Sequence, residues 1–181
     1  MTRLTADDFN RLYREHARRA QGFFLRMTGG DAALAEDLTQ ELFTRLWEHR
    51  DGFDARQGTF TTWMFSVAYN LCKNAYRHRD VVAAWSAETM ARNEPGDQAL
   101  STAAVSPAAD AALDRRELRE QLAAAVRSLP DGIREVFLLR YMEELPIGDV
   151  ARVLGIPEGT VKSRSFTALT TLREKMKRLT D

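Results

Sequence analysis

The stretch from Asp149 to Leu172, DVARVLGIPEGTVKSRSFTALTTL, constrains the fold of this chain more than any other segment. Its pattern predicts a helix, a tight turn over residues 154–157 and a second, longer helix. Ala151 and Gly155 are four residues apart, and they occupy the two positions where closely crossing helices leave no room for a large side chain. Gly155 can also adopt the positive φ that such a turn requires. We therefore expect a helix-turn-helix unit.

The second helix of this unit carries a local excess of positive charge. Residues 160–180 contain six basic residues and one acidic residue, a net of +5 in a chain whose formal charge is zero. Attraction to phosphates is the main sequence-independent contribution to DNA affinity. In such units the start of the second helix enters the major groove. The segment therefore favours DNA binding, and an ordinary helical hairpin in a bundle is the alternative.

Charge and composition divide the 181 residues into three parts. Residues 1–79 contain 12 basic and 10 acidic residues, residues 80–112 contain 1 and 5, and residues 113–181 contain 13 and 11. The middle part is rich in Ala, Ser, Pro and Gly and lacks a sustained apolar period, which is typical of a flexible linker. We expect an all-α chain with two small helical domains, 1–79 and 113–181, joined by the linker 80–112.

The two outer parts show helical apolar spacing and no strand-like alternation. Thr5, Asp31 and Thr59 each precede such a pattern and are expected to cap a helix. The expected helices cover residues 6–27, 31–50, 60–79, 113–128 and 133–145, followed by the helix-turn-helix unit after Pro146.

Several other classes of protein find no support in the sequence. No run of about 18 apolar residues is present, so no membrane span is expected, and the charged N-terminus excludes a signal peptide. The single Cys72 allows no internal disulfide and indicates the cytoplasm, where we expect a buried, inert thiol. No metal-ligand spacing or phosphate-binding motif occurs, so we expect no metal and no cofactor. An enzyme with a DNA-binding tail is the weakest interpretation.

Two surfaces of the first part combine aromatic, charged and amide side chains. The polar face of the second helix suits a protein partner, and it contains Asp37, Gln40, Glu41, Phe43, Arg45 and Trp47. The third helix and the loop before it suit single-stranded DNA, because aromatic rings stack on bases and cations hold the backbone. That set contains Phe53, Asp54, Arg56, Gln57, Thr59, Asn70, Lys73, Asn74 and Arg77. A solvated face and a buried core are the respective alternatives.

These motifs, in this order, resemble one known family. The segment AEDLTQELFTRLWEHRDGFDARQGTFTTWMFSVAYNLCKNAYRHR is similar to region 2 of the extracytoplasmic-function branch of the bacterial sigma-70 initiation factors. The segment LPDGIREVFLLRYMEELPIGDVARVLGIPEGTVKSRSFTALTTLREKM is similar to region 4. The two cover about half of the chain, and the lack of a region 3 domain between them is itself characteristic of this branch.

The resemblance implies that the chain binds core RNA polymerase and promoter DNA. The face of the second helix would contact the clamp helices of the β′ subunit, and region 4 would contact the β flap. The loop from Phe53 to Thr59 would accept a flipped base of the −10 element, with Asn70, Lys73, Asn74 and Arg77 near the upstream DNA. The −35 element would be read by Glu158, Thr160, Lys162, Ser163, Arg164 and Phe166.

The resemblance also implies control by an anti-sigma factor, and membrane contact only through that partner. The chain departs from the family in two places. The family usually carries further arginines after Arg164, whereas residues 165–171 supply none, which predicts fewer phosphate contacts. Primary members melt DNA with two adjacent aromatics, whereas this chain has Trp63 followed by Met64, so strand capture is expected to rest on the loop. The alternative function is a classical helix-turn-helix regulator that binds duplex DNA alone.

Overall fold

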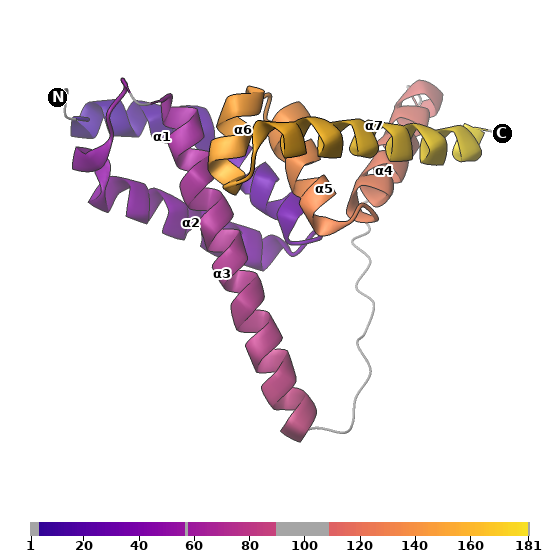
Figure 1. Cartoon of the computed structure of the whole chain (residues 1–181), viewed down its shortest axis with the longest axis horizontal. Coiled ribbons are helices and arrows are strands. Elements are labelled where there is room, and N and C mark those ends of the chain that lie inside the picture. The colour runs from indigo at the N-terminus through magenta and orange to yellow at the C-terminus, as the bar shows by residue number, and fades with distance from the viewer. Residues whose placement is uncertain (1–3, 57, 90–108, 181) are drawn as a thin grey trace.

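The structure, a computed structural model, describes residues 4–56, 58–89 and 109–180 of the chain. Within these ranges there are seven α-helices and no strand, so the all-α prediction is confirmed. The helices are α1 (Ala6–Met27), α2 (Ala32–Glu48), α3 (Phe60–Thr89), α4 (Ala109–Arg127), α5 (Asp131–Phe137), α6 (Ile147–Leu154) and α7 (Glu158–Thr180). A short 3-10 turn, η1 (Arg50–Gly52), follows α2, and a π-helical segment, η2 (Leu138–Met142), follows α5 (Figure 1).

Helices α1, α2 and α3 form a first unit, and each begins at the predicted cap. Thr5 and Asp8 make a reciprocal capping box, and the side chain of Asp31 accepts a hydrogen bond from the backbone of Leu34. The hydroxyl oxygen of Thr59 accepts a 3.1 Å hydrogen bond from the backbone N–H of Thr62. These caps satisfy backbone donors that a helix start leaves without partners.

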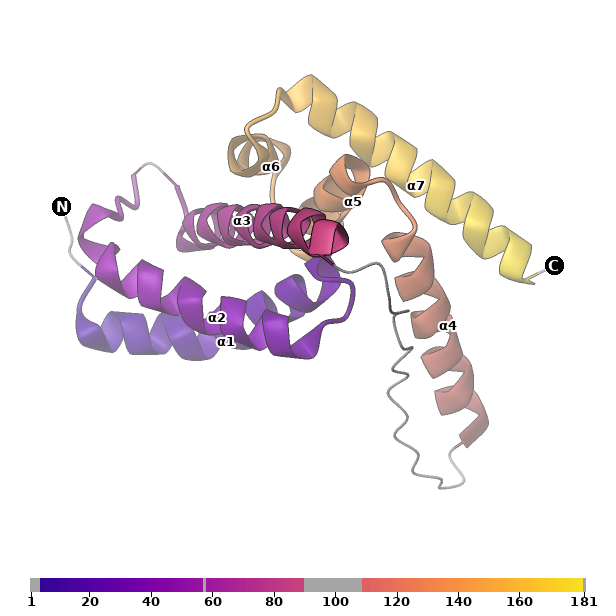
Figure 2. The same ribbon diagram turned by 90° about the horizontal axis from the view of Figure 1, so that it is seen from below.

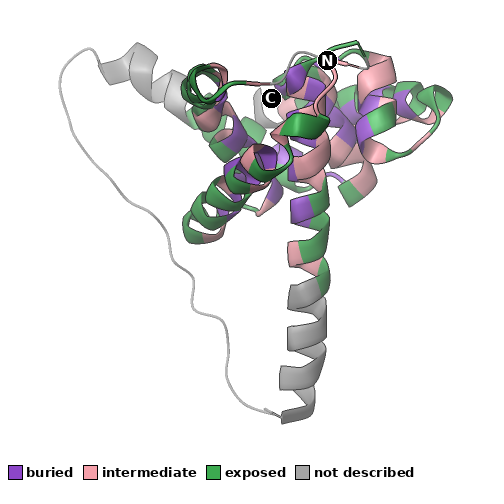
Figure 3. Ribbon diagram, turned by 90° about the vertical axis from the view of Figure 1, so that its left-hand side faces the viewer, coloured by how far each residue is buried: buried purple, intermediate pink, exposed green. Residues whose placement is uncertain are grey.

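The core of the first unit is rich in aromatic side chains. Phe23, Phe24, Leu42, Met64 and Phe65 are fully buried where the three helices face one another. The rings of Phe23 and Phe65 meet edge to face at 5.1 Å between centroids, which is a favourable geometry for aromatic pairs. Figure 3 shows buried positions on the inner faces of the helices and exposed positions on the outer faces.

The helices on either side extend into the predicted linker at both ends. Helix α3 continues to Thr89, past the predicted end at Arg79, and α4 begins at Ala109 rather than after residue 112. Residues 80–89 contain neither Gly nor Pro and include four alanines or valines in a row, so nothing local ends the helix. The composition of the whole segment is dominated by residues 90–108, which lie outside the described ranges. The C-terminal half of α3 therefore projects from the rest of the unit (Figure 1).

Helices α4 to α7 form a second unit that contains the helix-turn-helix. Gly155 has φ of 65° and ends α6 in the left-handed conformation, as predicted. The predicted lack of room for a side chain at this position is wrong, because no atom would lie within 4 Å of a Cβ added there. Val150 and Val161 are fully buried between α6 and α7. Val153 is the other well-buried residue of α6.

The helix predicted over residues 133–145 is not one regular helix. It starts at Asp131 as α5 and continues as the π-helical η2, which ends at Met142. Glu144 follows with φ of 54°, the positive value that non-glycine residues adopt only rarely. The irregular ending places Glu143 in a buried position with its side chain facing the first unit.

The two units are in direct contact. Helix α6 packs beside α3, as Figure 2 shows from below. Elsewhere, Glu143 pairs with Arg19 and Arg26 of α1. An apolar cavity of about 470 Å³ lies between the end of α1 and α4, and arginines at positions 26, 119 and 127 line it.

Candidate nucleic-acid interface

A small cavity lies where the loop after α2 meets the start of α3. Its volume is about 180 Å³, and its lining includes Phe53, Asp54, Gly58, Thr59, Trp63 and Arg152. The first five come from the loop and the start of α3, which the sequence predicted as the −10 site. Arg152 comes from α6 of the second unit, and no local pattern predicts its place at the cavity.

Two aromatic rings, those of Phe53 and Trp63, line this cavity, and the ring of Phe60 packs against both. Phe53 and Trp63 stack with centroids 5.3 Å apart and an interplanar angle of 29°. Phe60 meets Phe53 edge to face at 6.0 Å and Trp63 at 5.8 Å. Phe60 is buried, whereas Phe53 and Trp63 remain half-buried. Trp63 is therefore held in one orientation, with part of its surface left for contact with a planar ligand.

The loop is braced by its own charged residues. Arg56 donates from its backbone N–H and from Nε to Oδ1 of Asp54, each at 3.0 Å, and from a terminal nitrogen to Oδ2 at 3.0 Å. This pairing raises the pKa of the Arg56 guanidinium. Arg56 stays exposed, so its cation still faces solvent beside the cavity. The side chain of Thr59 caps α3, and Gln57 lies outside the described residues.

The remaining residues predicted for −10 DNA share the outer surface of α3. Asn70, Lys73, Asn74 and Arg77 are all exposed. Tyr76, on the same helix, is half-buried and donates a hydrogen bond to the carbonyl of Met27, which fixes this part of α3 against α1. The exposed set forms a polar, basic surface that begins one turn or more beyond the cavity.

The face of α2 predicted to bind polymerase is only partly exposed. Asp37, Gln40 and Glu41 face solvent, and Arg45 is half-exposed and pairs with Glu41 at 2.5 Å.

The placement of Phe43 on that exposed face is wrong, because Phe43 is 5 % exposed. Its ring packs edge to face against Tyr13 at 4.7 Å and Phe9 at 6.3 Å. Trp47 is half-buried, and its ring centroid lies 5.1 Å from that of Phe9. The guanidinium carbon of Arg50 lies over the Trp47 ring, 4.0 Å from its centroid. The two aromatics therefore contribute to the packing of α1 on α2, and the accessible part of the face is acidic and amidic.

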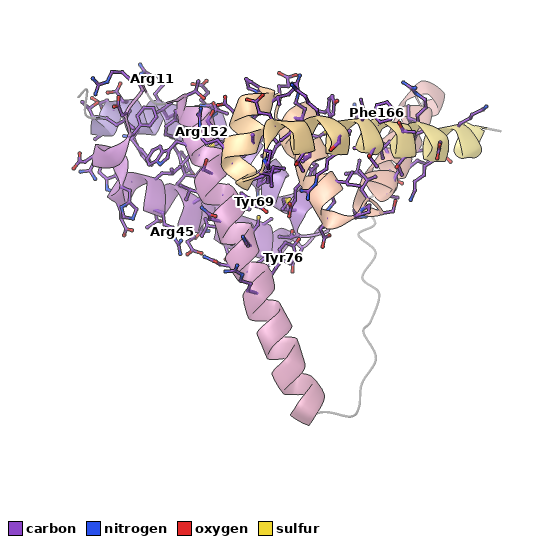
Figure 4. The ribbon with its side chains drawn as sticks, in the orientation of Figure 1. Arg11, Arg45, Tyr69, Tyr76, Arg152 and Phe166 are labelled. Carbon is purple, nitrogen blue, oxygen red and sulfur yellow. The ribbon has the colours of Figure 1, made fainter. Side chains whose placement is uncertain are left out.

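The predicted −35 residues near the start of α7 differ in how far their side chains are exposed to solvent. Glu158, Lys162 and Ser163 are exposed and Thr160 is half-buried. Phe166 is 72 % exposed, which is unusual for a large aromatic. Figure 4 labels it on the long helix of the second unit.

Arg164 differs from its neighbours because its guanidinium turns toward α5. It donates a 3.4 Å hydrogen bond to the carbonyl of Gly132, and a Cβ added at Gly132 would lie 2.9 Å from it. Ser165, next in sequence, is buried. Arg164 thus connects α7 to α5, in addition to any contact with DNA.

A half-buried pair of polar side chains, Tyr69 and Glu135, connects the two units. The hydroxyl of Tyr69 donates a 3.2 Å hydrogen bond to Glu135 of α5. Burial, with the nearby carboxylate of Glu135, raises the pKa of Tyr69 to about 12. Burial also raises the pKa of Glu135 and raises the pKa of the Cys72 thiol to about 12. The prediction that Cys72 is buried is confirmed by its 1 % exposure, and its lack of reactivity stays a prediction.

No group of three His, Cys, Asp or Glu side chains suited to a metal ion occurs among the described residues. No helix in the same part of the chain is both long and apolar enough to cross a membrane.

Residues 12–81 match the sigma-70 region 2 family, and residues 119–172 match sigma-70 region 4. The chain is 31% identical over 150 residues to the ECF RNA polymerase sigma factor SigW of Bacillus subtilis, covering 83% of this chain and 79% of that protein. It is 33% identical over 171 residues to the ECF sigma factor SigL of Mycobacterium tuberculosis, covering 93% and 88%. The chain belongs to the ECF sigma factors. The resemblance inferred from the two sequence segments is thereby confirmed.

Two solved structures share the fold of this one. The sigma factor RpoE from Bartonella quintana, in complex with the anti-sigma factor NepR, superposes with a TM-score of 0.72 at 19% identity, covering 95% of this chain and 98% of that one. CnrH, in complex with the cytosolic domain of CnrY, gives a TM-score of 0.65 at 22% identity, covering 96% and 90%.

The sequence patterns did not predict four residues that line the cavity or connect the two units. Arg152 lines the cavity, and Arg19, Arg26 and Glu143 connect the units. Arg19 and Arg26 are seven residues apart, which puts both on one face of α1. That spacing could have marked a basic surface, but no local pattern identifies Glu143 as its partner.

Proposed function

We propose that this sigma factor is a dissociable initiation factor that binds core RNA polymerase, captures the melted −10 strand and reads −35 duplex, without a catalytic reaction of its own. The observation that carries the proposal is the cavity between the loop and α3. Its stacked rings Phe53 and Trp63 offer an aromatic surface to a base, and Arg56 supplies an exposed cation for the strand.

The other two surfaces fit the same activity. The exposed Asp37, Gln40 and Glu41 of α2 would contact polymerase, and the exposed Lys162, Ser163 and Phe166 of α7 would approach the −35 major groove. The β flap would hold the second unit, and the exposed polar face of α3 would follow the DNA upstream of the cavity. The protein would act in the cytoplasm, where transcription takes place.

An anti-sigma factor is the proposed regulator. The support is that RpoE, which shares the fold, was solved in complex with the anti-sigma factor NepR. Any membrane contact would then come through the regulator.

In vitro transcription with purified core enzyme tests the proposal. Promoters are selected from a random library with the reconstituted holoenzyme, and the −10 and −35 elements are read from the selected pool. Transcription that depends on this chain is expected from the selected promoters. If no promoter is transcribed in a chain-dependent way, the proposal fails. A chain that binds duplex DNA tightly and specifically as a dimer without polymerase would instead be the classical regulator.

A further inference from the structure

We propose that in the free chain the second unit covers the −10 cavity, and that an interdomain latch of Arg19, Arg26 and Glu143 holds it there. The inference rests on the proposed function, since it assigns the regulation of the cavity described above. It predicts a closed free form and an open form that polymerase must select.

The latch is built around a carboxylate that has no access to water. The side chain of Glu143 is 1 % exposed, and Nε of Arg19 donates to its Oε2 at 2.8 Å. Arg26 donates to Oε1, and a terminal nitrogen of Arg19 donates to the backbone carbonyl of Glu143. All three hydrogen bonds come from α1. Because a buried charge needs its partners, the second unit has one favoured position on the first.

The latch defines how the two units are placed more than it adds to the free energy that holds them together. The side chains of Arg19 and Arg26 are 35% and 34% exposed, so water weakens their attraction to the carboxylate. Nε of Arg26 is buried without a hydrogen-bond partner, which is a cost of the closed arrangement. The latch therefore specifies how the units meet while leaving an equilibrium that a binding partner can shift.

The closed arrangement brings α6 to the cavity itself. Arg152 of α6 lines the cavity together with the loop and the start of α3. It approaches the loop so closely that a Cβ added at Gly58 would lie 3.2 Å from its terminal nitrogen. Figure 4 shows Arg152 between α3 and α6. Tyr69 and Glu135 make a further contact between the units, two helical turns along α3 from Trp63. A base could not enter freely while α6 lies there.

The closed form also cannot hold both promoter elements. Their names place them about 25 base pairs apart, which is roughly 85 Å along B-form DNA. The cavity and α6, however, are in direct contact. The connecting residues 90–108, if fully extended, would span roughly 65 Å, so the chain has enough length for the units to move far apart. Promoter binding therefore requires the latch to open.

Charge reversal in the latch tests the inference. The double variant Arg19→Glu/Arg26→Glu places three carboxylates together and should open the free chain. Adding Glu143→Arg restores opposite charges and should close it again. Arg14→Glu/Arg18→Glu is the matched control, because both arginines are exposed on the same helix and belong to no described ion pair of the latch. Arg19→Gln/Arg26→Gln is the milder form, and circular dichroism checks that each variant retains its helices.

Two readouts on the free full-length chain separate the outcomes. Spin labels at Ala33→Cys on α2 and Thr170→Cys on α7, in a Cys72→Ala background, report the distance between the units. Unlabelled chains report the affinity for a single-stranded oligonucleotide carrying the selected −10 sequence. The opened variant is expected to give longer, broader distances and about tenfold tighter strand binding, because the competent fraction rises. The control should match the original chain.

Unchanged distances in both latch variants would overturn the inference. Longer distances with unchanged strand affinity, while the holoenzyme still captures the strand, would show that the second unit does not cover the cavity and would overturn it as well. If even the holoenzyme fails to capture the strand, the proposed function fails, and the distances alone then decide whether the latch exists.

Discussion

The phenol of Tyr69 donates a 3.2 Å hydrogen bond to Oε2 of Glu135, and this contact joins α3 of the first unit to α5 of the second. Burial raises the pKa of Glu135, so the folded chain keeps a proton at this carboxyl at pH values where the unfolded chain has lost it. Its contribution to stability is complete below the unfolded pKa near 4.5 and is lost as pH rises through the folded pKa.

The substitution Glu135→Gln should remove the loss of stability that the ionisation of Glu135 causes as pH rises. The amide oxygen still accepts a hydrogen bond from Tyr69, but the side chain no longer ionises in a buried position. We expect the free energy of unfolding to fall less between pH 4.5 and pH 7 than in the original chain, as measured by urea titration. The exposed Glu174→Gln is the control and should leave the pH dependence unchanged. An identical pH dependence in Glu135→Gln would contradict the account.

The substitution Trp63→Ala should weaken capture of the −10 strand. It removes the ring that stacks on Phe53 and lines the cavity, and base stacking on an aromatic contributes about 1–3 kcal/mol. Holoenzyme affinity for a −10 oligonucleotide should fall by roughly tenfold or more. Phe166→Ala removes an exposed aromatic from α7 and should leave this affinity unchanged. Equal losses in both variants would argue against a specific base site.

The substitution Lys162→Ala should alter the −35 preference, because the side chain is exposed near the start of α7. If it contacts a base, its loss costs about 1–3 kcal/mol and relaxes specificity at one position.

Arg164→Ala should instead reduce both −35 affinity and the stability of the second unit, since its guanidinium also donates to the carbonyl of Gly132. Selection of −35 sequences with each variant, beside thermal unfolding, separates the two roles. Unchanged preference in both would exclude them from recognition.

The substitution Gly155→Ala should destabilise the helix-turn-helix by about 1–2 kcal/mol, because a Cβ is unfavourable in the left-handed conformation. Space is no obstacle, since no atom would lie within 4 Å of that Cβ. Gly159 has equal space but lies inside α7, where alanine is favoured over glycine. Gly159→Ala should therefore stabilise the chain. Urea unfolding measures both, and the same sign for the two variants would refute the argument.

Cys72 should react slowly with thiol reagents in the folded chain. Its side chain is buried, and burial raises its pKa to about 12, so little thiolate exists at pH 8. Labelling with a chromogenic disulfide at pH 8 should be at least about a hundredfold faster in denaturant than in buffer. The exposed Ala33→Cys is the internal standard and should react quickly in both conditions. Rapid native labelling of Cys72 would show that α3 opens locally.

The local parts of this structure followed from local sequence. The caps at Thr5, Asp31 and Thr59, and the turn at Gly155, depend on residues within four positions of one another. The end of α3 did not follow, because the composition of residues 90–108 outweighed the helix-forming residues 80–89 in the same window. Phe43 was misplaced because a helical face that is polar on average still contains a position that α1 covers.

The sequence by itself determined the helical units, the helix-turn-helix and the family, because periodicity, caps and motif order are properties of neighbouring residues. Only the tertiary structure decided that the helix-turn-helix unit lies over the cavity beside Phe53 and Trp63. Arg152 reaches the cavity from a distant segment, and Glu143 pairs with arginines more than a hundred positions away. Whether a buried carboxylate finds its partners depends on how two units pack, and that information is spread over both surfaces rather than held in any one stretch of the chain.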